Sequence, residues 1–136
     1  MAGQLVKQQE NLSIAISDWH LISETIFLVT RSQNVSVEFT LLNTQLLYAV
    51  GQATQGQQLD VKISILGPGI NNENDAAQVI TYPSLAYTWQ VFHPASGTLT
   101  LDPGHYVVTV QVKQHSNGGV NLLTAQKAYL AISGTA

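Results

Sequence analysis

Apolar and polar residues alternate along much of this chain, most regularly between residues 97 and 112. The apolar side chains of that stretch fall at every second position of two runs: Leu99 and Leu101, then Tyr106, Val108, Val110 and Val112. Alternation with period two, rich in β-branched residues, is typical of a strand with one buried face. Residues 99–101 and 106–112 are therefore predicted to form two strands joined by a turn.

The same pattern recurs on both sides of this pair and predicts an all-β protein. Further strands are expected over residues 10–16, 26–30, 35–41, 45–50, 59–65, 78–82, 87–92, 120–123 and 127–132. No segment repeats apolar residues with the helical spacing i, i+3, i+4 and i+7, so no helix is expected. Residues 1–9 are rich in Gln and are predicted to be an N-terminal tail or an arm that pairs with a sheet edge. Residues 10–136 are predicted to be a single β-sandwich domain.

The turn sequences indicate how these strands connect. The Asp-Pro-Gly turn at residues 102–104 suits a type II turn, whose twist does not match a tight hairpin. We therefore expect an arch between two sheets there. The Asn-Gly pair at residues 117–118 favours the type I′ turn of a hairpin, which predicts that the flanking strands pair with each other. The Asn-Thr pair at residues 43–44 is expected to be a short turn between separate strands.

One stretch carries a family resemblance. Residues 101–110, LDPGHYVVTV, resemble a strand of the jelly rolls of tumour-necrosis-factor-like proteins and complement globular heads, and of small bacterial and phage β-sandwich proteins. Residues 128–132, AYLAI, are similar to the final strand of such domains. The resemblance implies an antiparallel β-sandwich with jelly-roll topology of about ten strands. It also implies a homotrimer that binds partners rather than catalysing a reaction.

The composition narrows the choice of partners. Charged residues make up 10% of the 136 residues, where about a quarter is usual, and the amide and hydroxyl residues Gln, Asn, Ser and Thr supply about a third of the chain. The net charge is −3, and the five cations are scattered along the sequence. Nucleic-acid binding needs clustered Lys and Arg, so it is not expected.

The shortage of charge has two interpretations: the neutral surface of a monomeric domain, or a surface covered in an assembly, since interface cores lose charged residues. Few charges also leave sheet edges poorly protected. Both arguments favour a homo-oligomer. The absence of Cys excludes disulfides and thiolate metal sites. No signal-peptide pattern and no run of ~20 apolar residues occurs, which predicts a soluble chain without membrane insertion, compatible with a virion or an extracellular appendage.

Few residues indicate a chemical site. The four His residues show no metal-binding spacing, and no G-x-S-x-G elbow is present, so enzymatic activity is not expected. No cofactor is expected beyond a weak calcium candidate in an oxygen-rich loop, which a solvated turn explains equally well. The candidate calcium ligands are Asn71, Asn72, Glu73, Asn74 and Asp75.

The ligand-binding candidates are Trp19, His20 and Tyr82, because aromatic side chains beside polar residues can act as platforms for sugars. Trp19 interrupts a strand pattern, whereas Tyr87 and Trp89 are expected in the core. The sequence thus predicts a non-enzymatic, self-assembling jelly-roll module with a structural or recognition role, of the appendage, fibre or capsid-decoration type. The alternative is a lectin-like module with a glycan or host-surface partner.

Overall fold

The computed structural model describes residues 3–15, 18–48, 51–52, 58–71, 78–81, 87–93, 99–114 and 122–134. These residues form eleven strands and no helix, so they include no helix that could cross a membrane. The strands are β1 (Gly3–Ala15), β2 (His20–Val29), β3 (Gln33–Tyr48), β4 (Gly51–Gln52), β5 (Gln58–Gly67), β6 (Ile70–Asn71), β7 (Gln78–Thr81), β8 (Tyr87–His93), β9 (Leu99–Leu101), β10 (Gly104–Gln114) and β11 (Leu122–Gly134).

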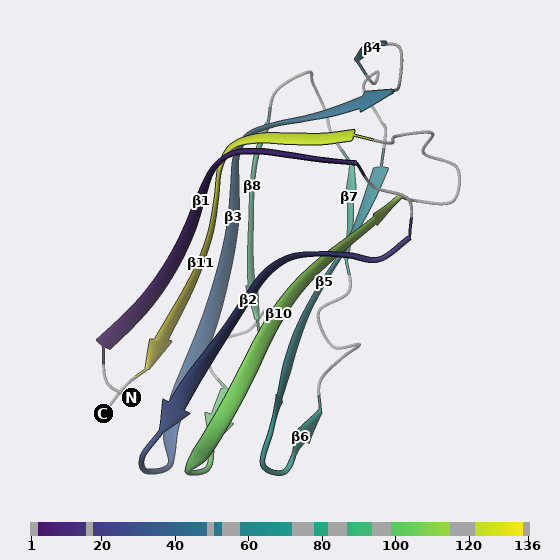
Figure 1. Ribbon diagram of the computed structural model, residues 1–136. Coiled ribbons are helices and arrows are strands. Elements are labelled where there is room, and N and C mark those ends of the chain that lie inside the picture. The colour runs from purple at the N-terminus through teal and green to yellow at the C-terminus, as the bar shows by residue number, and fades with distance from the viewer. Residues whose placement is uncertain are drawn as a thin grey trace.

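The strands form two antiparallel sheets that pack as a sandwich (Figure 1). In sheet A, β11 lies between β1 and β3, and the other edge of β3 pairs in turn with β9, β8 and β4. In sheet B, β10 lies between β2 and β5, and the other edge of β5 pairs with β6 and β7. Apart from the short strands β4, β6 and β9, each sheet thus has four strands.

The chain passes from one sheet to the other at most of its connections. Strands β1, β3, β8 and β11 belong to sheet A, whereas β2, β5, β7 and β10, which lie between them in the chain, belong to sheet B. This alternation, with first and last strands paired with each other, is the topology of a double-sheet jelly roll. The fold class predicted from the alternating pattern is confirmed.

The core lies between the two sheets and consists of the alternating apolar residues of the longest strands. Their side chains exclude water from both inner faces, which drives the packing of one sheet on the other. The largest fully buried side chains come from β3, β5, β10 and β11 together with neighbouring strands: Tyr106, Phe39, Leu41, Leu59, Ile63, Ile65, Leu101, Leu123, Leu130, Ile132, Val29 and Val35.

The arch between β9 and β10 is confirmed, because β9 pairs with β3 in sheet A and β10 pairs with β2 and β5 in sheet B. The buried Tyr106 fixes it: its hydroxyl donates a hydrogen bond of 2.7 Å to the backbone carbonyl of Asp102, at the turn. The Tyr106 ring stacks on Phe27 with ring centroids 5.5 Å apart. A Cβ at Gly67 would lie 2.2 Å from this ring, so the close packing requires glycine there.

The turn predicted at residues 43–44 is wrong, because β3 runs unbroken from Gln33 to Tyr48. Asn43 has φ of 49° and Asn11 in β1 has φ of 52°, and both lie beside Gln126 of the intervening strand β11. The Asn43 side-chain amide donates a hydrogen bond to Gln126 Oε1. Asn tolerates this left-handed conformation, so β1, β11 and β3 bend together instead of ending (Figure 1). For the same reason β11 is one strand, not the two predicted over 120–123 and 127–132.

The hairpin predicted around residues 117–118 is also wrong. The flanking strands lie in different sheets: β10 pairs with β2 and β5, and β11 pairs with β1 and β3. The turn residues themselves lie outside the described ranges. A local turn preference of this kind is weaker than the burial that each strand gains between two partners.

The edges β1 and β2 lie side by side at one border of the sandwich. Lys7 Nζ donates a hydrogen bond of 2.6 Å to the backbone carbonyl of Glu24, and Gln9 Nε2 donates one of 2.6 Å to the carbonyl of Ile22. These side chains occupy two backbone acceptors on the edge of sheet B. Strand β1 also starts at Gly3, earlier than the predicted residue 10, because residues 3–10 pair with β11.

Candidate binding face on sheet B

The outer face of sheet B carries the side chains of β2, β10 and β5 that point away from the core. Strand pairing sets Ile26 beside Val107, and Val107 beside Leu66. We call these three residues the apolar row. Ile26 is 61% exposed and Leu66 is 50% exposed, although side chains of this kind gain free energy when water is removed from them.

The apolar row lies within a larger exposed apolar area. Six large hydrophobic side chains are exposed among the described residues: Leu5, Val6, Leu21, Ile26, Leu28 and Leu66. Four of them, Leu21, Ile26, Leu28 and Leu66, lie on the outer face of sheet B. A cluster of exposed apolar residues on one face is typical of a surface that contacts a partner, whereas single exposed residues are ordinary.

A shallow hollow of about 260 Å³ adjoins the apolar row on the same face. It is lined by Lys62, Ser64, Leu66, Val107, Thr109 and Gln111. Ser64 and Thr109 are paired neighbours on β5 and β10, and their short side chains leave the space between the longer residues on either side. The hollow is therefore polar at one end, where Lys62 and Gln111 pair, and apolar at the other.

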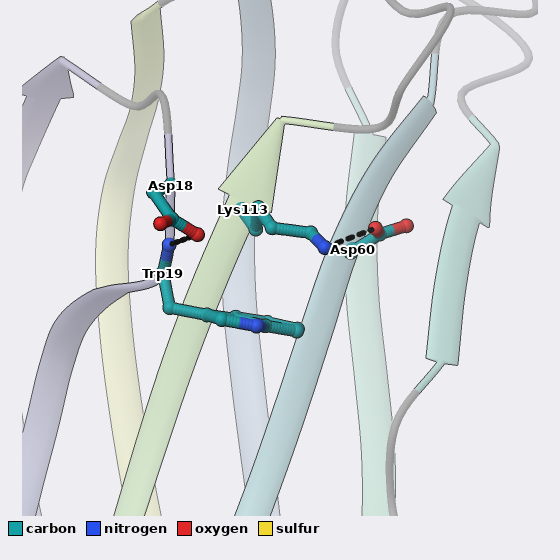
Figure 2. Close-up of polar contacts among 4 residues, drawn as sticks. All are labelled: Asp18, Trp19, Asp60 and Lys113. Atoms are coloured by element: carbon teal, nitrogen blue, oxygen red, sulfur yellow. Dashed lines mark hydrogen bonds and ion pairs between the residues drawn. The ribbon is translucent and has the colours of Figure 1, made fainter.

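Trp19 lies next to the polar end of the hollow, in the connection before β2. Its ring centroid is 4.5 Å from Lys62 Nζ and 5.0 Å from Lys113 Nζ, and Lys113 Nζ lies 4.0 Å from Asp60 Oδ2. The Trp19 backbone N–H donates a hydrogen bond of 2.8 Å to Asp18 Oδ1. Figure 2 shows the indole reaching across β10 toward β5, with the Lys113 side chain beside it. We call Trp19, Lys62, Lys113 and Asp60 the lysine–tryptophan cluster.

This cluster was not predicted, because its two cations are far apart in the sequence. Lys62 lies opposite Gln111 and Lys113 lies opposite Asp60, so pairing of β5 with β10 brings two of the five cations to one ring. The indole face attracts both ammonium groups. The carboxylates of Asp60 and Asp18 lie at Lys113 and at Trp19, and Glu24 pairs with Thr109 on the same face, so the positive charges of the cluster are matched by nearby negative ones.

The predicted ligand-binding residues are not brought together as a group. Trp19 lies on the outer face of sheet B, whereas His20, which is exposed, pairs with Val112, a residue whose side chain faces the core. Tyr82 lies outside the described residues, as do the side chains of Tyr87 and Trp89.

The outer face of sheet A is organised differently, around Glu38 on β3. Glu38 Oε1 accepts hydrogen bonds from Thr40 Oγ1 at 3.2 Å, from the Tyr129 hydroxyl at 3.0 Å and from Gln90 Nε2. These donors come from β3, β11 and β8, so one carboxylate links three strands. Charge-assisted bonds of this kind are stronger than neutral ones. The polar groups of this face thus satisfy one another.

The described residues contain no group of three or more His, Asp or Glu side chains arranged to hold a metal ion. Most of the candidate calcium ligands lie outside the described ranges. Asn71 ends β6, whereas Asn72, Glu73, Asn74 and Asp75 are not among the described residues. Calcium binding by this loop stays a prediction. A melting temperature that rises with millimolar calcium would support it, since a ligand bound only to the folded state stabilises that state. An unchanged melting temperature would exclude it.

No protein-family profile and no curated protein sequence matches this chain. Among solved structures, it resembles a chain of the T13 particle of infectious bursal disease virus, with a TM-score of 0.47 and 7% identity over 96% of this chain and 31% of that chain. It also resembles VP2 of the subviral particle of that virus, with a TM-score of 0.48 and 9% identity over 96% and 32% of the two chains. FlhE gives a TM-score of 0.29 at 9% identity over 96% of both chains.

The chain thus spans about a third of the length of these viral chains. A likeness of this degree carries no conclusion about function. The jelly-roll assignment given above depends on the strand order of the two sheets.

Proposed function

We propose that this chain is a non-enzymatic jelly-roll module that assembles with further copies of itself and has a structural role. The observation that carries the proposal is the outer face of sheet B, where Ile26, Leu28 and Leu66 are exposed around the partly buried Val107. The apolar row itself holds no charged side chain, and Glu24 on β2 and Lys62 on β5 border it. Loss of charge and exposure of large apolar side chains are the features of an interface core.

A second copy of the chain is the partner that fits best. Only 10% of the residues are charged, so the rest of the surface has little to keep copies apart. Strands β1 and β2 are sheet edges. On β2, the backbone carbonyls of Ile22 and Glu24 accept hydrogen bonds from side chains of β1. The occupied acceptors on β2 discourage open-ended strand pairing at that edge, which favours the sheet face as the contact surface.

The number of copies expected is three, from the family resemblance of residues 101–110. A role in an appendage, a fibre or a capsid decoration would suit such an assembly. Light scattering on the purified chain at micromolar concentration tests the proposal. A mass three times that of the chain is expected, and a monomer at every concentration would contradict self-assembly.

Saccharide binding is a second candidate function, favoured by the position of Trp19 beside a polar hollow. The hydroxyls of Ser64 and Thr109 and the amide of Gln111 line this hollow and can pair with sugar hydroxyls. A glycan array on the wild type and on Trp19→Ala tests it. Binding lost in the variant is expected, and no binding of any glycan by the wild type would contradict it.

A further inference from the structure

We propose that copies of the chain join through the two halves of this face, with the Glu24 carboxylate of one copy paired with the Lys62 ammonium of the next. This inference rests on the proposed function, self-assembly through the outer face of sheet B, and names the contact that sets the register of the copies. Its basis is the distribution of charge, because Glu24 lies on β2 and Lys62 lies on β5, on opposite sides of β10.

Each half of the face combines an exposed apolar side chain with one charge. On β2, the exposed Glu24 lies two residues from Ile26, and on β5, Lys62 lies four residues from Leu66. The two charges are opposite in sign, so the β2 half of one copy is complementary to the β5 half of another. Contact between two β2 halves would instead set carboxylate against carboxylate, which is unfavourable.

Rotational symmetry brings the two halves together. Copies placed around an axis that runs parallel to β10, in front of this face, present the β2 half of each copy to the β5 half of the next, in a ring of three as in a pair. Such a rotation keeps the height along the strands. Glu24 would therefore lie level with Ser64 of the next copy, since both residues pair with Thr109. Lys62 is two residues further along β5, about 7 Å, which its long side chain can span.

The surroundings of Lys62 keep its charge on this face. Lys62 Nζ lies 4.5 Å from the centroid of the Trp19 ring, whereas the ion pair of the lysine–tryptophan cluster joins Lys113 with Asp60 at 4.0 Å. The cation–π contact positions the Lys62 ammonium and leaves it charged. Because the charges of the face are balanced within one copy, the contact contributes register and specificity, and the apolar row contributes most of the affinity.

Sedimentation equilibrium on charge-reversed variants tests the inference. Glu24→Lys and Lys62→Glu should each weaken association about threefold, because each sets like charges against each other, and the loss should shrink at high salt. The double variant restores opposite charges and should associate within about twofold of the wild type. If Lys62→Glu does not fold, Glu24→Gln, Lys62→Gln and their double variant replace it, and the double variant should then lose no more than either single one.

Glu10→Lys and Lys127→Glu are the matched controls, because Glu10 and Lys127 pair with each other on sheet A and their reversal changes the net charge equally. Neither control should change association. An equal loss in the controls would show a general charge effect and would overturn the inference, as would a double variant of Glu24 and Lys62 that associates no better than its single variants. Unchanged association in both single variants, with a loss in Ile26→Ser, would overturn the inference and leave self-assembly intact. A wild type that stays monomeric would overturn both.

Discussion

The two outer faces of the sandwich differ in the side chains that they carry: hydrogen-bonded polar groups around Glu38 on sheet A, and exposed apolar groups on sheet B. On sheet A, Glu38 accepts one hydrogen bond from Thr40 on its own strand and two from neighbouring strands, so these polar groups satisfy one another. On sheet B, Ile26, Val107 and Leu66 form a row in which Ile26 and Leu66 are at least half exposed. Both sheets share one core and one fold. This difference is the basis of the proposal that sheet B is the face that meets a partner.

The largest effect is expected from Gly67→Ala, which disturbs the apolar row through the core beneath it. The new Cβ would lie 2.2 Å from the buried Tyr106 ring, which stacks on Phe27 and has no space to move away. A loss of about 3 kcal/mol in the free energy of unfolding is expected in denaturant titrations.

Gly69→Ala is the control for this change. Gly69 has φ of 71°, but a Cβ added there would meet no atom within 4 Å beyond its chain neighbours, so only backbone strain of about 1 kcal/mol is expected. A cost for Gly67→Ala no greater than that for Gly69→Ala would contradict the close packing described here.

Glu38→Ala tests whether hydrogen bonds among the polar side chains on the outer face of sheet A stabilise the fold. Removal of the carboxylate leaves three donors without this acceptor, and Thr40 among them is buried. A loss of about 2 kcal/mol is expected in thermal or denaturant unfolding, with no change in the molecular mass in solution. Glu38→Gln, which keeps an acceptor oxygen, should cost less. A change in the molecular mass in solution for either variant would show that the outer face of sheet A also affects assembly, and would contradict the contrast between the two faces.

A smaller effect is expected from Tyr106→Phe, which removes the hydrogen bond to the Asp102 carbonyl and costs about 1 kcal/mol. Burial, and then the negative charge of Asp102, raise the pKa of the Tyr106 hydroxyl above 10.0. The stabilisation from this group is complete below pH 10 and is lost as the pH rises through the higher folded pKa, since the unfolded tyrosine ionises first. Denaturant unfolding from pH 8 to pH 11 should show a steeper loss in the wild type than in the variant, and equal slopes would contradict this.

The fold was largely predictable because its signals are local. Alternation in β3, β5 and β10 identifies the inner faces, and the Pro-Gly turn at 103–104 indicates the arch. The shared bend was not predictable, since Asn11, Asn43 and Gln126 meet only after three strands have paired. An Asn with positive φ can end a strand or bend it, and the sequence does not distinguish the two cases.

The candidate face was much harder to predict than the core. Residues 26–29 of β2, IFLV, are continuously apolar, so their pattern does not distinguish inner from outer positions. Pairing with β10 makes the distinction: Phe27 lies beside the buried Tyr106, whereas Ile26 lies beside Val107 on the outside. The meeting of Lys62 and Lys113 likewise depends on the register of β5 against β10.

Sedimentation equilibrium on three proteins tests most directly whether the outer face of sheet B mediates assembly. Ile26→Ser removes the most exposed residue of the apolar row, and Val6→Ser removes an exposed apolar residue from the outer face of sheet A. The wild type and Val6→Ser are predicted to associate equally, and Ile26→Ser at least tenfold more weakly, since burial of such a side chain contributes about 1.5–3 kcal/mol. Equal association of all three proteins, or a loss confined to Val6→Ser, would contradict the account.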